Sequence, residues 1–225
     1  HWDPVTKLLA SAGNPCSTVF GGHEGGVYSV RLDARGECVY SGGNDGTVRK
    51  WHIKSGECLL VMQGHESAVC PVDVTRDGLA VFSGGSDRVI RKWDADTGAE
   101  LLMMEGHEGW VMCVSISLDG KMVCSGSKDM TVRLWDASTG ALSRVMSGHS
   151  GRVIGVALSA NASHVYSGSD DKSIREWDAM SGVCLRTLLG HTSYVSSVCL
   201  SNDGQCLYSG SRDGTVGVWD LKEGS

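Results

Sequence analysis

The sequence predicts an all-β propeller, and three observations lead to this fold class. Strand-like apolar stretches alternate with turn signals along the whole chain. Tryptophan recurs every 42 residues, from Trp51 to Trp219. Gly-His recurs with the same step, at His23, His65, His107, His149 and His191. A fixed period of this length is typical of repeat architectures, so we predict five copies of one unit with no insertions between them.

Each repeat is predicted to contain four short strands. The first carries two valines three residues apart, such as Val27 and Val30, which indicates a β-bulge because a regular strand alternates with a period of two. Pro71 lies between the equivalent valines of the second repeat, which places this strand at a sheet edge. The second strand precedes an aspartate at a tight turn, the third ends at the tryptophan, and the fourth follows a glycine turn. Four strands cannot bury both of their faces alone, so the copies are expected to stack radially.

The two ends of the repeat region leave the number of blades open. The fifth repeat has no residues for a fourth strand, whereas residues 16–22 match one, with Cys16 and Phe20 at the positions of Cys58 and Met62. The chain is therefore predicted to form a closed five-bladed ring or part of a larger propeller, for example one of seven blades. We divide it into an N-terminal segment, 1–15, in which Trp2 could end a preceding repeat, and a propeller, 16–225, with 16–22 as its closing outer strand.

Composition excludes several classes of function. The 20 basic and 26 acidic residues give a net charge of −6, so no nucleic-acid partner is expected. No apolar run approaches the ~18 residues that a membrane helix needs, so no membrane association is expected. The nine cysteines lie in different repeats and form no C-x-x-C pair, which predicts free thiols, no metal or other cofactor, and an intracellular location, cytoplasmic or nuclear.

The chain resembles the WD40-repeat family over residues 16–225. In that family each blade carries a hydrogen-bonded set of His, Ser or Thr, Asp and Trp. The five matching sets are His23, Ser41, Asp45 and Trp51; His65, Ser83, Asp87 and Trp93; His107, Ser125, Asp129 and Trp135; His149, Ser167, Asp171 and Trp177; and His191, Ser209, Asp213 and Trp219. The resemblance implies that these tetrads are structural and tie the strands of each blade together.

Serine, histidine and aspartate also form the triad of serine hydrolases, in which a carboxylate-oriented base activates a hydroxyl. Five identical sets would require five active sites, and no Gly-x-Ser-x-Gly elbow is present. We therefore predict that the chain is not an enzyme and keep a hydrolase as a distant alternative.

Positions that differ between repeats are the candidates for partner binding, because shared positions build the scaffold. The resemblance points to three positions of each blade on the narrow top face: the two that flank the first strand valine and the one before the tetrad aspartate. The candidate residues are Tyr28, Trp110, Met112, Lys128, Arg152, Ile154, Asp170, Tyr194 and Arg212. Aromatic residues and arginine supply much of the binding energy at protein interfaces. The alternative is that Trp110 and Tyr194 only cover blade edges.

These observations favour a non-catalytic scaffold for protein–protein interaction, or a module that recognises a peptide or substrate within a larger complex, with its partners on the top face. The alternative is a regulatory sensor domain of a multidomain signalling protein. No residue of the sequence identifies the partner.

Overall fold

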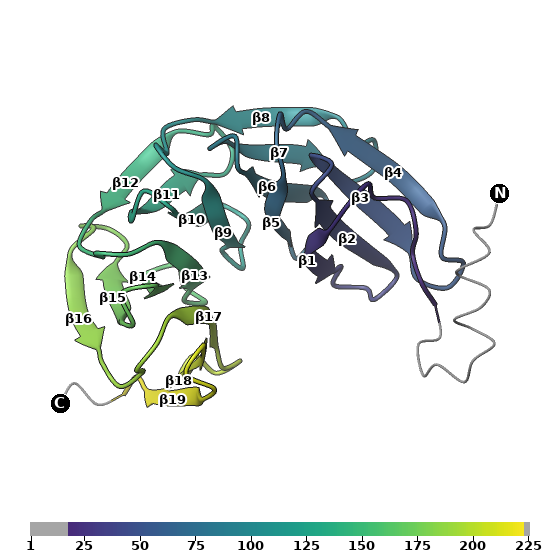
Figure 1. Cartoon of the computed structure of the whole chain (residues 1–225). Helices are drawn as coiled ribbons and strands as arrows, with labels where there is room; N and C mark the ends of the chain where they lie inside the picture. The colour runs from purple at the N-terminus through teal and green to yellow at the C-terminus, as the bar shows by residue number, and fades with distance from the viewer. Residues whose placement is uncertain (1–17, 223–225) are drawn as a thin grey trace.

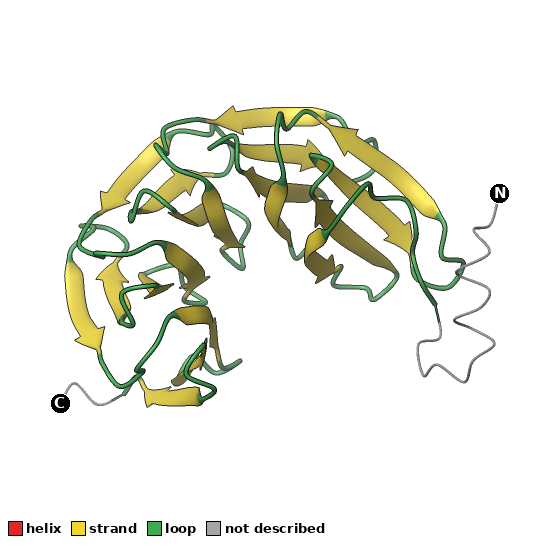
Figure 2. Ribbon diagram, viewed as in Figure 1, coloured by secondary structure: helices red, strands yellow, loops and turns green. Residues whose placement is uncertain are grey.

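The protein consists of β-strands and loops in the computed structural model, which describes residues 18–222 (Figure 2). The 19 strands of the described part form five antiparallel sheets, four of them with four strands and the last with three. Each sheet contains consecutive strands of one repeat, so we number the sheets blades 1 to 5 in chain order. The predicted all-β fold of stacked blades is confirmed. Within the described residues there is no helix long and apolar enough to cross a membrane.

The first two strands of each blade lie nearest the centre of the arrangement. They are β1 (Val27–Leu32) and β2 (Cys38–Gly43), β5 (Val69–Val74) and β6 (Ala80–Gly85), β9 (Val111–Ile116) and β10 (Met122–Ser127), β13 (Val153–Leu158) and β14 (His164–Ser169), and β17 (Val195–Leu200) and β18 (Cys206–Ser211). The register of every first strand shifts between its two valines, which confirms the predicted bulge. Pro71 lies in β5, which pairs only with β6 and is the inner edge of its sheet.

The outer strands complete the blades. They are β3 (Thr47–His52) and β4 (Cys58–Gln63), β7 (Ile90–Asp94) and β8 (Glu100–Met104), β11 (Val132–Asp136) and β12 (Leu142–Met146), β15 (Ile174–Asp178) and β16 (Cys184–Leu188), and β19 (Val216–Asp220) in blade 5. A glycine with a positive φ lies in each turn between the third and fourth strands, as the sequence predicts: Gly56, Gly98, Gly140 and Gly182.

The hydrophobic core lies between neighbouring blades. Val48 and Met62 of blade 1, both fully buried, belong to one cluster with Val69 and Trp93 of blade 2. The same arrangement recurs at the next boundaries between blades. Each blade therefore buries its apolar side chains against the next repeat, which accounts for the strict period of the sequence.

The five blades follow an open arc, with β1, β5, β9, β13 and β17 on its concave side and β4, β8, β12 and β16 on its rim (Figure 1). The end faces of the arc expose apolar side chains. Val30 of β1 is 61% exposed and Val216 of β19 is 74% exposed. The equivalent residues Val114 and Val132 of blade 3 are 5% and 0% exposed. The structure therefore has the form of a partial propeller.

The described part of the expected closing strand, residues 18–22, is not a strand in this structure. Phe20 stacks on Trp51 with ring centroids 5.8 Å apart, so this segment lies against blade 1. Blade 5 is at the other end of the arc, and β19 has no strand on its outer side among residues 18–222. Met62, at the equivalent position of the next repeat, belongs to one cluster with Trp93 while its strand β4 pairs with β3, so the contact of Phe20 with Trp51 is the one expected of an outer strand that precedes blade 1. The two ends of the arc lie apart, and this segment therefore forms no strand with β19. The predicted segment 1–15 and Cys16 lie outside the described residues.

Candidate functional site

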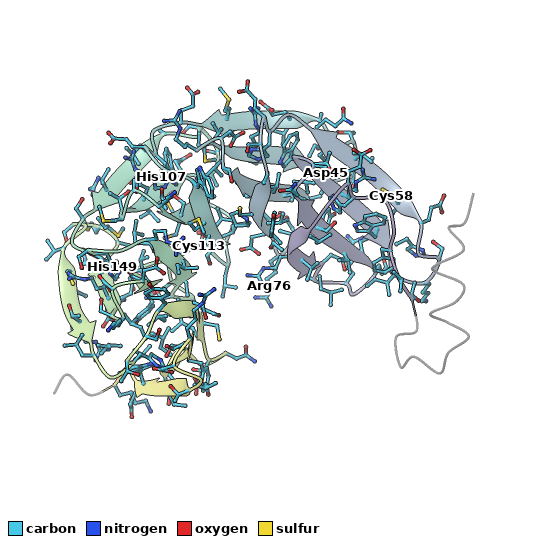
Figure 3. The ribbon with its side chains drawn as sticks, in the orientation of Figure 1. Asp45, Cys58, Arg76, His107, Cys113 and His149 are labelled. Atoms are coloured by element: carbon cyan, nitrogen blue, oxygen red, sulfur yellow. The ribbon has the colours of Figure 1, made fainter. Side chains whose placement is uncertain are left out.

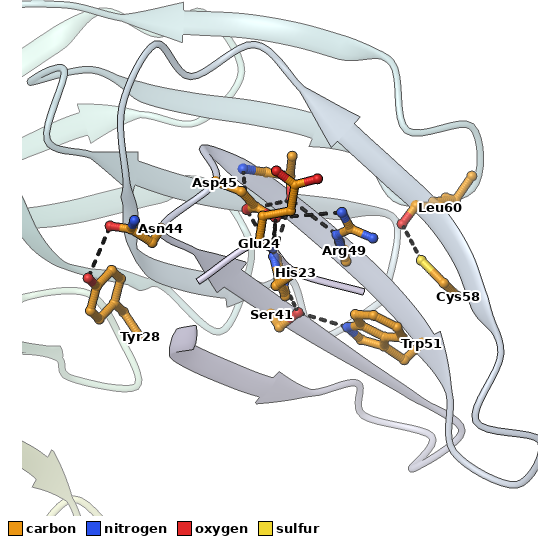
Figure 4. Close-up of polar contacts among 11 residues, drawn as sticks. His23, Glu24, Tyr28, Ser41, Asn44, Asp45, Arg49, Trp51, Cys58 and Leu60 are labelled. Carbon is orange, nitrogen blue, oxygen red and sulfur yellow. Dashed lines mark hydrogen bonds and ion pairs between the residues drawn. The ribbon is translucent and has the colours of Figure 1, made fainter. Parts of the chain in front are cut away.

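The polar set that recurs in each repeat forms a chain of hydrogen bonds inside its blade. In blade 3 the indole Nε1 of Trp135 donates to Ser125 Oγ at 2.8 Å, and Ser125 Oγ lies 2.8 Å from His107 Nε2. His107 Nδ1 lies 2.8 Å from Asp129 Oδ2. The corresponding contacts in blade 1, drawn in Figure 4, measure 2.7, 2.7 and 2.9 Å. All five sets have this geometry, and each links the second and third strands to the loop before the first.

The protonation states follow from the network. Burial lowers the pKa of His107, and the hydrogen bond to Asp129 only partly offsets this effect. Burial alone would raise the pKa of Asp129, but hydrogen bonds from His107 and Thr131 outweigh it, and the net pKa is well below the usual range. At neutral pH the histidine is therefore neutral and the aspartate ionised. His107 Nδ1–H donates to the carboxylate, and its Nε2 accepts from the serine hydroxyl.

A fifth residue joins the set in four blades, and the sequence reasoning missed it. Thr131 Oγ1 donates to Asp129 Oδ1 at 2.6 Å. Thr47, Ser173 and Thr215 do the same in blades 1, 4 and 5. Blade 2 has Val89 at this position. The recurrence of a hydroxyl residue two positions after the aspartate was the signal that could have revealed it.

The order of contacts from serine to histidine to aspartate is that of a hydrolase triad, but the surroundings differ. The serine side of each set is closed: Ser83, Ser125 and Ser167 are fully buried. Each serine oxygen also accepts a hydrogen bond from a tryptophan indole. Figure 3 places His107 and His149 within blades 3 and 4. A substrate carbonyl has no access to such an oxygen, whereas a nucleophile must reach its substrate.

The variable top-face positions are brought together in pairs by the backbone. In each blade, the amide of the residue before the tetrad aspartate donates to the carbonyl of the residue before the first valine. Lys128 is joined in this way to Trp110, Asp170 to Arg152, and Arg212 to Tyr194, at 2.9 Å in each case. The two side chains of each pair therefore lie next to each other at one end of the blade.

The predicted partner-binding residues differ in exposure. Trp110 and Tyr194 are 46% and 39% exposed, and Tyr28 is 57% exposed and donates to Asn44 Oδ1 at 3.1 Å. Lys128 and Arg212 are exposed as well. Lys128 Nζ lies 4.5 Å from the centroid of the Trp110 ring, a cation–π contact.

Three of the candidates lie deeper. Met112 and Ile154 are half-buried in β9 and β13. The side chain of Asp170 is mostly buried and forms an ion pair with the exposed Arg152. The structure therefore places an aromatic or charged pair at the same end of each of blades 3 to 5, and Met112 and Ile154 lie deeper in the first strands of blades 3 and 4.

The tips of the turns between second and third strands are top-face residues that the sequence reasoning missed. Arg88, Met130 and Lys172 occupy these tips with φ angles of 72°, 68° and 72°. Gly46 and Gly214 stand at the same point in blades 1 and 5. Comparison of the five repeats at this position would have revealed the variation.

The described residues contain no group of three or more His, Cys, Asp or Glu side chains that could hold a metal ion. Their eight cysteines are free thiols. Cys113 and Cys124 lie in adjacent strands of blade 3, and burial raises the pKa of both thiols. These thiols are protonated at neutral pH and act as small apolar core residues.

The repeats, the stacked blades and the hydrogen-bonded tetrads define a WD-repeat protein. The WD40 family, described as WD domain, G-beta repeat, matches residues 13–52, 56–94, 98–136, 140–178 and 182–220. The chain therefore belongs to the WD40 family.

Short stretches of the chain are similar to proteins named for ribosome biogenesis. A ribosome biogenesis protein BOP1 homolog of Arabidopsis thaliana is 41% identical over 56 residues, which is 25% of this chain and 7% of that protein. Ribosome biogenesis protein erb1 of Aspergillus niger is 45% identical over 56 residues, again 25% of this chain and 7% of that protein. The erb1 protein of Neurospora crassa is 56% identical over 39 residues, 17% of this chain and 5% of that protein. The matches thus span less than a tenth of these relatives.

Proposed function

We propose that the chain is a non-catalytic scaffold whose top face binds protein or peptide segments within a larger assembly. The observation that carries this proposal is the contrast between shared and variable positions. The shared Ser, His, Asp and Trp side chains satisfy one another inside the blades. The variable pairs, such as Trp110 with Lys128, lie exposed at one end. Exposed aromatic and cationic side chains on a rigid support are the usual anchors of a protein interface.

The assembly that we propose to test first is one that acts in ribosome biogenesis, with the chain located in the nucleus. This proposal is supported by the names of the relatives that share short stretches with the chain. The proposed role in ribosome biogenesis is more specific than the proposed binding role of the top face. The binding role does not depend on it.

The binding role is tested by quantitative affinity purification of tagged variants. Trp110→Ala and Arg152→Ala are expected to lose the same set of partners, because both side chains belong to one exposed surface. Leu118→Ala is the matched control: Leu118 is 53% exposed but lies in the turn after β9, at the opposite end of the blade. The proposal is wrong if both top-face variants retain the partners of the unmodified chain.

Absence of catalysis is tested with a fluorophosphonate probe that labels activated serines. We expect the probe not to label Ser125, because Ser125 is fully buried and accepts a hydrogen bond from Trp135. The unmodified chain and Ser125→Ala should therefore give the same signal. Labelling that is specific to Ser125 would establish the hydrolase alternative.

A further inference from the structure

A pocket of about 550 Å³ lies on the top face between blades 2 and 3. Its walls come from three loops. Ser86 and Arg88 belong to the turn between β6 and β7, Glu108 and Trp110 to the loop before β9, and Lys128 to the turn between β10 and β11. Two adjacent blades therefore each contribute a cation to one pocket, with an indole ring between the blades.

Neither cation of the pocket has a carboxylate partner among residues 18–222. Arg88 is exposed and takes part in no ion pair, and Lys128 contacts only the face of the Trp110 ring. Several other basic side chains are paired, for example Arg91 with Glu100 and Arg152 with Asp170. The two cationic groups of the pocket are thus not held in ion pairs of the described structure.

Two carboxylates, those of Glu108 and Asp129, also line the pocket. Asp129 accepts hydrogen bonds from His107, from Thr131 and from the backbone amide of Glu108, so its oxygens are already occupied. Glu108 is the one other carboxylate that lines the pocket. The lining therefore contains two cations and two carboxylates, and the carboxylate of Asp129 is held by the hydrogen bonds of the tetrad, which leaves Arg88 and Lys128 free to bind a ligand.

The backbone at Arg88 has the left-handed conformation that this turn position has in every blade. Its φ of 72° lies in the left-handed region, which favours glycine, and glycine is present at the same turn position in blades 1 and 5. A long cationic side chain is therefore held at the pocket in a backbone conformation that opposes it.

We infer that this pocket binds an acidic segment of a protein partner, with an Asp or Glu carboxylate between Arg88 and Lys128 and a neighbouring apolar side chain against Trp110. The inference rests on the proposed binding role of the top face and specifies the chemistry of the partner. Charge-assisted hydrogen bonds from arginine and lysine suit a carboxylate, and the indole suits an apolar neighbour. A nucleic acid is disfavoured because its many phosphates would face a chain of net charge −6, whereas an acidic segment brings one or two carboxylates to the two cations.

The test is selection of a phage-displayed random 12-residue peptide library on the immobilised chain, followed by affinity measurement of the selected peptides. We expect enrichment of peptides that carry Asp or Glu within a few positions of an apolar residue. Arg88→Ala and Lys128→Ala should each weaken their binding about tenfold, and higher salt should weaken it further. Lys121→Ala, an exposed cation in the turn between β9 and β10, is the matched control and should leave binding unchanged.

A pair of glycine substitutions separates binding from folding. Arg88→Gly relieves the left-handed backbone, so we expect an unchanged or higher Tm together with weaker binding. Lys172→Gly makes the same change at the equivalent turn of blade 4 and should leave the selected peptides bound.

Three outcomes would overturn the inference. Selected peptides without acidic residues that still depend on Trp110 would refute the acidic partner but leave the proposed function standing. Peptides whose binding depends on no top-face residue, or no enrichment at all, would contradict both. Displacement of the acidic peptides by single-stranded RNA at equal concentration would show that the pocket recognises phosphate in place of carboxylate.

Discussion

Blades 3 and 5 share one hydrogen-bonding pattern and differ in burial. The contacts from Trp219 through Ser209 and His191 measure 2.8 Å each, as in blade 3. Val216 is nevertheless 74% exposed, whereas its counterpart Val132 is fully buried. Within residues 18–222, blade 3 has a neighbour on both sides, and blade 5 has a neighbour only on the side of β13.

This difference separates two sources of stability. The tetrad forms within a blade and is present whether or not the outer face is covered. Apolar burial is supplied by the neighbouring repeat, as expected of an architecture whose stability is a sum of repeat and interface contributions. Identical substitutions in the two blades should therefore have unequal effects on the free energy of unfolding.

The largest effect is expected for removal of the tetrad tryptophan. Trp135→Ala should lower the free energy of unfolding by about 4 kcal/mol, because a fully packed indole leaves a cavity and an unpaired serine. Trp219→Ala should lower it by about half as much, since that side chain is only half-buried. Urea unfolding followed by tryptophan fluorescence measures both. Equal losses would mean that blade 5 is covered in solution.

Removal of the tetrad carboxylate should come next. Asp129→Ala leaves His107 Nδ1–H, the hydroxyl of Thr131 and the amide of Glu108 without their acceptor, and we expect a loss of about 3 kcal/mol. In Asp213→Ala the exposed Thr215 turn allows water to replace the carboxylate, so the loss should be smaller. Comparison of the two Tm values checks the prediction, and a greater drop in blade 5 would contradict it.

A smaller effect is expected at the third strand. Val132→Thr places a hydroxyl in the fully buried core and should cost about 2 kcal/mol. Val216→Thr should change stability by less than about 0.5 kcal/mol, because the residue faces solvent. The pair sharpens the comparison, since a large effect at Val216 would reveal a covering element on blade 5.

The smallest effect is the pH dependence that arises in the central blades. Burial lowers the pKa of His107 and His149 below the ordinary value of 6.5, so the neutral form is favoured in the folded state. Their stabilisation is complete above pH 6.5 and is lost as the pH falls through the lowered pKa values. The depressed pKa of Asp129 adds a further loss below its ordinary value of 3.8. Tm should therefore fall by a few degrees from pH 7 to pH 5, and a rise over this interval would refute the protonation states.

The repeat period predicted most of the fold because every unit carries the same types of strand and turn residues at the same positions. The valine spacing predicted the bulges, and Pro71 predicted the inner edge. The sequence predicted either a closed five-bladed ring or part of a larger propeller, and the open arc agrees with the second of these forms, because the pattern of one repeat does not decide closure. Residues 18–22 resemble an outer strand, yet Phe20 stacks on Trp51 at the opposite end from blade 5.

The candidate site could be predicted only in part for a similar reason. Variation between repeats pointed to Trp110, Lys128 and Arg152, but it did not reveal that Lys128 stacks on Trp110. Arg88 was missed because its importance depends on a pocket formed by two blades and on a backbone angle. Neither property is visible in the pattern of one repeat.

The central claim is that tetrad positions support the fold and top-face positions support binding. Its most direct test is recovery of partners by affinity purification from cells that express Ser125→Ala or Trp110→Ala, normalised to the amount of folded protein and carried out well below either Tm. Ser125→Ala is expected to lower Tm and retain the partners, and Trp110→Ala to retain Tm and lose them. Loss of partners with Ser125→Ala and retention with Trp110→Ala would contradict the account.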